Sequence, residues 1–353
     1  MLGALIILFT LSFSLLSKKR SFWFFFIALV WIGIGIADFV QRSYRSMPIT
    51  ASDIFLMSSV KDIFELYMSH FQLVLIMLGI SLLLGGLVYI WLITKKRKSI
   101  IVFGISSVLF LGSVLFLSIF LMLRSGNLAP TSEFHSLPRA YKNNGFVYCF
   151  SASLVTRGVD EPDDYSPDRV EDVLEEAEKE LPDTAENTPN IIFVQLESFF
   201  DPKYMKDLSL EYDPVPNFTY LKENYSSGLL SVPAIGAGTA NTEFEVLSGM
   251  NLSHFGVGEY PYMTIVDSAS SESICHALGG IGYSTHAIHN NNATFYHRHI
   301  VYDNLGFDTY TALEYMDNVE YNPRGWADDS VLTEEIEKCL TSTEGRDLVF
   351  TVS

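Results

Sequence analysis

The chain has few cysteines, and their scarcity excludes two kinds of small stabilised domain. Its 353 residues contain three cysteines, and none lies in a Cys-x-x-Cys pair. Cys149, Cys275 and Cys339 are too scattered to form a disulfide framework and do not have the spacing of a zinc site. Because free cysteine is usually buried, we expect three small core side chains.

Basic residues are also scarce once the first third of the chain has passed. Residues 1–123 hold ten Lys and Arg against four Asp and Glu, a net charge of +6. Residues 124–353 hold 13 basic and 37 acidic side chains, a net charge of −24. A segment this acidic repels nucleic acid and favours cationic partners, metal ions included. We therefore predict no nucleic-acid partner.

Long apolar runs, in contrast, fill the first third of the chain. Each of four runs comes close to the roughly 20 residues that a bilayer-spanning helix needs. A cleaved signal peptide could account for the first run, but not for the other three. The sequence thus predicts a transmembrane domain over residues 1–123 with four helices, at 1–17, 22–40, 72–94 and 99–123.

The short loops predict the orientation of these helices. Loops 18–20 and 95–98 carry seven positive residues, and such loops stay on the cytoplasmic side. The longer loop 41–71 mixes three basic with three acidic residues, so we place it outside. Everything after Leu123 is then extracytoplasmic. Met1 would begin outside the membrane, directly at a span, so we expect an upstream helix to be missing.

The second part of the chain is predicted to be an α/β domain that follows a connector. Residues 124–189 form the connector, with an amphipathic acidic helix at 166–181. Residues 190–353 alternate short apolar strands with helices, which is typical of an α/β layer architecture. We expect buried strands at 190–196, 283–288 and 348–352, and helices at 240–248, 272–278, 295–304 and 330–340, the last of them exposed.

Two residues of this domain stand where such folds bind ligands. Glu197 directly follows the first strand, and a carboxylate at a strand's carboxyl end suits a hard divalent cation. Thr239 follows a glycine-rich turn, 236–238, and begins a helix, where the free N–H groups stabilise an alkoxide or a phosphate. The alternatives are a surface acid for Glu197 and a simple helix cap for Thr239.

Histidines gather in one short stretch, which indicates a site there. Five of the eight lie between residues 276 and 299. His289 follows the second strand as Glu197 follows the first, and Arg298 supplies a planar fork suited to phosphate. His286 and His289 would lie on opposite faces of a strand, which argues against a shared zinc ion. The alternative for His286, His297 and His299 is a structural or surface position.

Together these segments resemble the lipoteichoic acid synthase and phosphoglycerol transferase family of the alkaline phosphatase/sulfatase-like superfamily. The resemblance covers nearly the whole chain. It rests on the order and spacing of three motifs: Leu-Glu-Ser at 196–198, Thr-Ala-Asn-Thr-Glu-Phe at 239–244, and His-x6-Tyr-x-Arg at His289, Tyr296 and Arg298.

The resemblance implies a metal-dependent transferase. Glu197 and Thr239 would bind a divalent metal ion, typically manganese, with Thr239 as the nucleophile. His289, Tyr296 and Arg298 would hold the glycerol phosphate group. The family's Asp-His metal pair and a further substrate histidine, which follow a Thr-Val-Ser strand, have no counterpart here, and the family usually has five spans. We therefore expect a chain that is clipped at both ends.

The implied function is lipid-dependent transfer at the bacterial cell membrane. The donor would be phosphatidylglycerol, and the extracytoplasmic acceptor a glycolipid, a glycerolphosphate polymer or a glucan. A phosphoethanolamine transferase or a sulfatase of the same superfamily is the first alternative. The former tends to carry several disulfides, and the latter uses a modified Cys or Ser where Thr239 stands. A catalytically inactive membrane scaffold is the second alternative.

Overall fold

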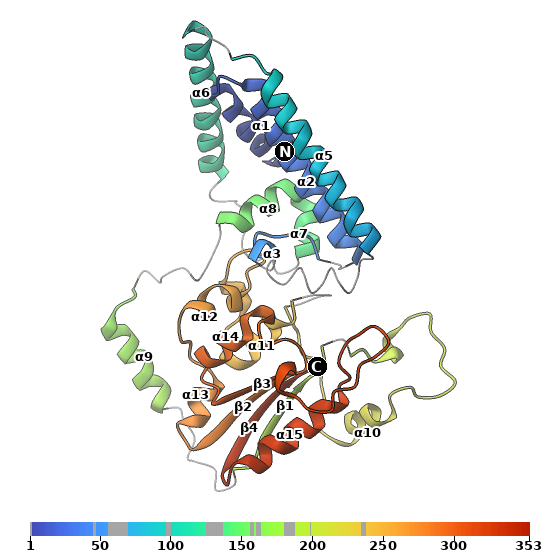
Figure 1. The fold of residues 1–353 in the computed structure, drawn as a ribbon. Coiled ribbons are helices and arrows are strands. Elements are labelled where there is room, and N and C mark those ends of the chain that lie inside the picture. Colours follow the sequence, from blue (N-terminus) through green and yellow to red (C-terminus); the bar gives the residue numbers. More distant parts are fainter. Residues whose placement is uncertain are drawn as a thin grey trace. The chain divides into compact units, whose positions relative to one another are not determined.

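The computed structural model (Figure 1) describes residues 2–44, 47–55, 70–96, 100–124, 137–155, 159, 164–179, 188–197, 199–233 and 238–353. The chain divides into two compact units. The first comprises Met1–Val173, Ile235–Gly238 and Asn251–Ile265, and the second Leu174–Ala234, Thr239–Met250 and Val266–Ser353. Parts of three predicted features lie outside the described residues: the two bridging loops 41–71 and 95–98, the connector, and the glycine-rich turn.

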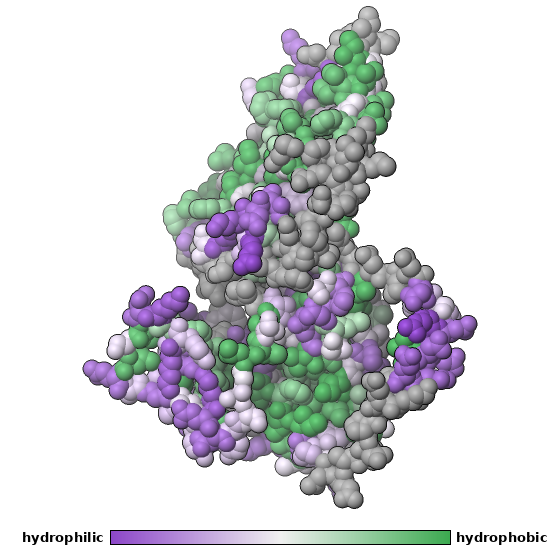
Figure 2. All heavy atoms as spheres, turned by 180° about the vertical axis from the view of Figure 1, so that it is seen from behind, coloured by the Kyte–Doolittle hydropathy of each residue, from purple (hydrophilic) through white to green (hydrophobic). Residues whose placement is uncertain are grey.

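Helices occupy all four predicted apolar runs of the first unit. They are α1 (Leu2–Ser12) with the 3-10 helix η1 (Phe13–Leu16), α2 (Arg20–Tyr44), α5 (His70–Ile93) and α6 (Ile100–Arg124). Within the described residues, two segments are long and apolar enough to cross a membrane, Arg20–Ser43 and Val74–Ile93. Figure 2 shows apolar side chains on the surface of these helices. Two membrane-type helices are thus present, and four spans remain a prediction.

A small core in the first unit joins its first helix to two later ones. α7 (Leu137–Asn144) and α8 (Phe146–Val155) bury Tyr141, Tyr148 and Cys149, and α1 packs on this cluster through Leu2 and Ile6. The short α3 (Ser52–Phe55) belongs to the same unit. The cluster therefore ties the beginning of the chain to residues more than 130 positions later.

The second unit is built on a parallel sheet of four strands in the order β1-β4-β2-β3 (Figure 1). The strands are β1 (Ile191–Gln195), β2 (Tyr283–His289), β3 (Thr309–Ala312) and β4 (Arg346–Val352). Gln195 of β1 and His289 of β2 both pair with Val352 of β4. The carboxyl ends of the three strands therefore lie at one edge of the sheet.

Further helices occur along the chain from residue 167 onward. They are α9 (Pro167–Lys179), α10 (Pro216–Asn224), α11 (Ala240–Ser248), α12 (Ile265–Ser268), α13 (Ile274–Gly279), α14 (Arg298–Asn304) and α15 (Ser330–Ser342). The 3-10 helices are η4 (Pro202–Tyr204), η5 (Leu252–His254), η6 (Pro261–Met263), η7 (Phe295–His297) and η8 (Leu313–Tyr315). α11 has the predicted bounds and ends at Gly249, which adopts the left-handed conformation at φ 70°.

Three local predictions are wrong, each for a physical reason. β1 is not buried but alternates, with Ile192 and Val194 exposed, because it is an edge strand of the described sheet. The helix predicted at 295–304 breaks into η7 and α14, because Tyr296 and His297 both have φ of 55°. The helix α15 is not fully exposed: its Val331, Leu332 and Cys339 pack on the sheet around Ile288 and Val349.

The three cysteines behave as predicted. Cys149, Cys275 and Cys339 are free and buried. Burial raises the pKa of the Cys275 thiol to about 12 and that of the Cys339 thiol to about 11. They are therefore unreactive core side chains.

Candidate active site

The aligned strand ends bring Glu197 and His289 to the same edge of the sheet. Both lie beside the end of β4: the Glu197 N–H donates to the Ser353 hydroxyl at 3.3 Å, and His289 Nδ1 bonds the Val352 carbonyl at 3.1 Å. A carbonyl can only accept, so Nδ1 carries the proton and Nε2 is left as an acceptor. Parallel pairing thus gathers two residues that are 92 positions apart.

Thr239 stands before α11 but does not cap it. Its side chain makes no hydrogen bond to the helix, and its Oγ1 donates instead to Glu197 Oε1. The structure therefore does not support the simple capping role. The hydroxyl of Thr239 and the carboxylate of Glu197 form one polar pair at the start of a helix, where free N–H groups also point.

Arg298 lies beneath this pair and is fully buried. Its Nε and Nη2 donate to the two carboxylate oxygens of Glu243, at 3.1 and 2.5 Å. Tyr302 adds a third hydrogen bond to Glu243, at 2.9 Å. Arg298 Nη2 also lies 3.6 Å from Glu197 Oε1. The guanidinium thus connects this partly buried pair to the core.

Glu243 is the site residue that sequence reasoning missed. It lies in α11, one helical turn after Thr239, and its side chain is fully buried. Residues four apart lie on the same face of a helix, so Glu243 lies on the same face as Thr239. The helix also buries Phe244 and Leu247, and this position was the sequence signal that Glu243 belongs to the site. Lys, Glu, Arg and Asp are almost never fully buried unless paired, which makes a buried Glu a pointer to a buried Arg.

The predicted phosphate-binding role of Arg298 stays a prediction, and the structure limits which of its nitrogens could fill that role. Its fork does not face an open site, because the Nε and Nη2 edge is taken by Glu243. Arg298 Nη1 and His289 Nε2 are buried and have no hydrogen-bond partner among the described residues. One free donor and one free acceptor are therefore what these two residues can offer a ligand.

Electrostatics set the protonation states around this site. Burial, and then the positive charge of Arg298, hold the pKa of His289 well below its usual range. His289 is therefore neutral at pH 7. Burial, and then the negative Glu243, raise the pKa of Glu197, while Arg298 and the Thr239 hydrogen bond act against that rise.

Tyr296 is buried beside Arg298 in an unusual backbone conformation. Its ring centre lies 5.4 Å from the guanidinium carbon, and the ring of Phe295 lies 5.7 Å from the same atom. Two consecutive non-glycine residues, Tyr296 and His297, have φ of 55°. Such strain persists only where the surrounding structure holds it, and it is concentrated at functional sites.

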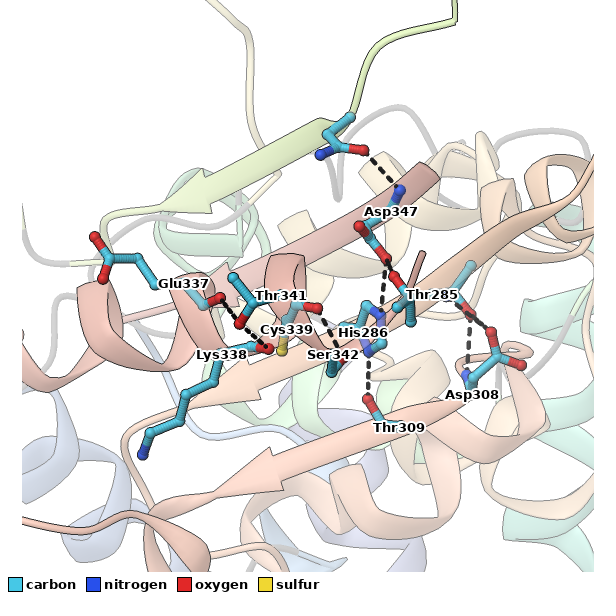
Figure 3. Close-up of polar contacts among 12 residues, drawn as sticks. Thr285, His286, Asp308, Thr309, Glu337, Lys338, Cys339, Thr341, Ser342 and Asp347 are labelled. Atoms are coloured by element: carbon cyan, nitrogen blue, oxygen red, sulfur yellow. Dashed lines mark hydrogen bonds and ion pairs between the residues drawn. The ribbon is translucent and has the colours of Figure 1, made fainter. Parts of the chain in front are cut away.

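The other histidines do not join the site. Figure 3 shows His286 in a separate cluster, where Nδ1 bonds the Thr309 hydroxyl at 2.7 Å and Nε2 lies 3.3 Å from Asp347 Oδ1. His297 pairs with Asp267 at 2.9 Å and is about one-third exposed. The sequence cluster of histidines is therefore not a single site, and the opposite-face prediction for His286 and His289 is confirmed.

The described residues fit a metal ion only in part. No group of three or more His, Cys, Asp or Glu that could hold a metal ion occurs among them. Glu197 Oε1 and Thr239 Oγ1 touch each other and provide two hard oxygen ligands. A carboxylate whose pKa is raised is one that a cation would stabilise. These two residues therefore suit part of a divalent ion's coordination shell.

The comparison with protein families decides the class of this unit. Residues 189–353 match the sulfatase family. This part of the chain is a sulfatase-like domain. The predicted alkaline phosphatase/sulfatase-like fold is thereby confirmed, as a helical region followed by an α/β domain with a parallel sheet.

Two proteins of Rhizobium meliloti (strain 1021) are relatives of the chain. One, described as a cyclic beta-1,2-glucan modification protein, is 31% identical over 216 residues, which are 60% of this chain and 32% of that protein. The other, the capsular polysaccharide biosynthesis protein RkpI, is 31% identical over 165 residues, 45% of this chain and 30% of that one. The chain thus spans about a third of the length of these curated relatives.

Two solved structures are also similar to the chain. The Streptococcus pyogenes phosphoglycerol transferase GacH, in complex with sn-glycerol-1-phosphate, shows a TM-score of 0.47 at 22% identity and covers 55% of this chain and 53% of its own. The lipoteichoic acid synthase LtaP of Listeria monocytogenes shows a TM-score of 0.39 at 22% identity and covers 47% of this chain and 40% of its own.

Proposed function

We propose that the protein is a membrane-anchored phosphoglycerol transferase that uses Thr239 as its nucleophile. The observation that supports this most is the Thr239 hydroxyl, which bonds Glu197 rather than capping α11. A hydroxyl that merely began the helix would bond the free N–H groups of the first turn. Here it is paired with a carboxylate at the edge where α/β sheets bind ligands.

The two covalent steps balance without a further reactant. Thr239 Oγ1 attacks the phosphorus of phosphatidylglycerol, the bond from phosphorus to the diacylglycerol oxygen breaks, and the Thr239 proton ends on diacylglycerol. An acceptor hydroxyl then attacks the same phosphorus, the bond to Thr239 breaks, and the acceptor's proton returns to Oγ1. A divalent cation held by Glu197 and Thr239 would lower the pKa of the hydroxyl and neutralise phosphate charge.

The remaining site residues bind and orient the donor. Arg298 Nη1 is free to donate to a phosphate oxygen, and neutral His289 Nε2 is free to accept from a glycerol hydroxyl. Tyr296 packs beside Arg298 and limits its movement. A free donor next to a free acceptor matches a head group that combines a phosphate with an alcohol.

The membrane half supports a lipid donor and an envelope acceptor. Two exposed apolar helices would hold the domain at the bilayer that contains phosphatidylglycerol. The printed names of the two Rhizobium relatives, a glucan modification protein and a capsular polysaccharide protein, favour a glycan among the possible acceptors. The basic loops 18–20 and 95–98 favour an orientation in which the domain lies outside the cytoplasm.

A trapped intermediate tests the reaction. The full-length protein is incubated with phosphatidylglycerol and manganese, quenched in acid and analysed by mass spectrometry. We expect a glycerophosphate adduct on the peptide that contains Thr239. A phosphoethanolamine adduct from phosphatidylethanolamine, or hydrolysis of an aryl sulfate, would instead establish one of the sister activities. No adduct from any donor would favour the inactive scaffold.

Reporter fusions test the orientation separately. A periplasmic-type reporter that is active only outside the cytoplasm should be active when fused after Arg124 and silent when fused within 95–98. The reverse pattern would contradict an extracytoplasmic site, whatever the chemistry of the domain.

A further inference from the structure

Arg298 is held in a way that restricts what it can bind. Two of its three nitrogens, Nε and Nη2, are bonded to Glu243, while Nη1 is buried and has no partner among the described residues. Both charged side chains are completely buried. The arginine therefore presents one donor edge of its guanidinium, rather than the full fork, to a ligand.

Glu243 also cancels the charge that Arg298 would otherwise present. The two side chains form an ion pair at 2.5 Å in the interior, where charges are screened far less than in water. The same Nη2 that bonds Glu243 lies 3.6 Å from Glu197 Oε1, so one guanidinium faces two carboxylates. Each further negative charge on a ligand is therefore repelled by two carboxylates, Glu197 and Glu243.

We propose that Glu243 sets the charge preference of the anion site, so that the site favours phosphodiesters, which carry one negative charge, over phosphomonoesters, which carry two. The inference rests on the proposed function, because it concerns the phosphate of the same donor. The inference adds a positioning residue that acts through Arg298. It also gives a physical reason why a transferase whose donor and product are both diesters discriminates against phosphomonoesters.

Anion binding, rather than turnover, tests this preference. Isothermal titration at pH 8, with manganese held constant, compares glycerophosphoglycerol with sn-glycerol phosphate. The monoester is then a dianion, because its second pKa is about 6. In Glu243→Gln, which keeps the shape but removes the charge, we expect the ratio of the two dissociation constants to shift at least about tenfold toward the monoester, since the second charge doubles the Coulomb effect.

Three further variants separate charge from structure. Asp347→Asn removes another fully buried carboxylate, which pairs with His286. Asp347 lies at the opposite end of β4 from the site. Tyr302→Phe removes a hydrogen bond to Glu243 without changing its charge. Both should leave the ratio as in the wild type. Arg298→Lys cannot serve Glu243 and a ligand together, so it should weaken the binding of both probes alike. If Glu243→Gln does not fold, the wild-type ratio decides, because equal affinity for the two probes contradicts the preference.

The outcomes separate this inference from the proposed function. An unchanged ratio in Glu243→Gln, or an equal shift in Tyr302→Phe, would overturn the role of the Glu243 charge while leaving the transferase intact. Wild-type affinity for both probes in Arg298→Lys would overturn the Nη1 contact. If the wild-type protein binds neither probe, the anion site does not exist and both proposals fail.

Discussion

The helical unit exposes large apolar side chains, whereas the sulfatase-like unit buries charged ones. Phe39 of α2 is 73% exposed and Leu82 of α5 is 75% exposed. Glu243, Arg298 and Asp347 of the second unit are each 0% exposed. Each arrangement would be unfavourable in the other's surroundings. Apolar exposure is stable where the solvent is lipid, and charge burial is stable where every charge has a partner. The contrast is the one expected of a chain with one unit in lipid and the other in water.

The largest expected effect comes from removing the proposed nucleophile of the second unit, Thr239. Thr239→Ala should reduce transfer at least roughly a thousandfold, as expected when the nucleophile is lost. Stability should hardly change, because the hydroxyl makes no cap bond that the helix could lose. Transfer is measured with labelled phosphatidylglycerol, and stability by thermal unfolding. Thr239→Ser and the exposed Thr341→Ala serve as controls, with partial and full activity. Full activity of Thr239→Ala would return Thr239 to a structural role.

The second prediction compares how much stability is lost when a buried ion pair and an exposed ion pair of the second unit are broken. Arg298→Met leaves Glu243 buried without its partner and should lower the free energy of unfolding by about 3–5 kcal/mol. Lys203→Met breaks an exposed pair with Asp213 and should cost about 1 kcal/mol or less. Denaturant unfolding of both variants measures the difference. Equal losses would show that burial does not govern these pairs.

The third prediction tests whether the helical unit is in fact surrounded by lipid. Leu82→Arg lies in the middle of Val74–Ile93 and should oppose membrane insertion by about 2.5–3.5 kcal/mol. Leu229→Arg, at a side chain that is 90% exposed in the sulfatase-like unit, should change stability by about 0.5 kcal/mol or less. An insertion assay and a carbonate extraction report on both. If Leu82→Arg inserts normally, α5 does not lie in the bilayer.

The smallest expected effect concerns Glu197 and its pH dependence. Because its pKa is raised in the folded protein, the folded state binds this proton more tightly than the unfolded chain does. The resulting stability is present below the ordinary pKa of about 4.5 and is lost as the pH rises through the higher folded value. Without metal, Glu197→Gln should therefore melt slightly above the wild type at pH 8 and not at pH 4.

Metal addition gives the corresponding control. Manganese should raise the melting temperature of the wild type at pH 8 and have less effect on Glu197→Gln, because a neutral amide is a poorer ligand than a carboxylate. A wild type that melts above the variant at pH 8 without metal would contradict the raised pKa. An equal response of both proteins to manganese would remove Glu197 from the metal site.

Local sequence patterns were sufficient for much of the fold. The segment 283–288 before His289 was predicted as a strand and forms most of β2, and Gly249 marked the end of α11. The positions of Glu197 and His289 directly after strands predicted that they share a sheet edge, because parallel strands align their carboxyl ends. These features depend on residues that are close in the chain, so a single sequence carries them.

Other features were decided only by contacts between distant residues. β3, with four residues, is too short to show a periodicity, and β1 is half-exposed because of its place at the sheet's edge. The left-handed backbone conformation of Tyr296 and His297 could not be predicted from the sequence, because neither residue is a glycine. The pair of Glu243 and Arg298 spans 55 positions. The sequence by itself determined which segments are apolar, helical or extended and which polar residues follow them. Only the tertiary structure decided that the guanidinium of Arg298 bonds Glu243. A buried charge is stable only beside a partner of opposite charge, and the packing of distant segments determines which residue that partner is.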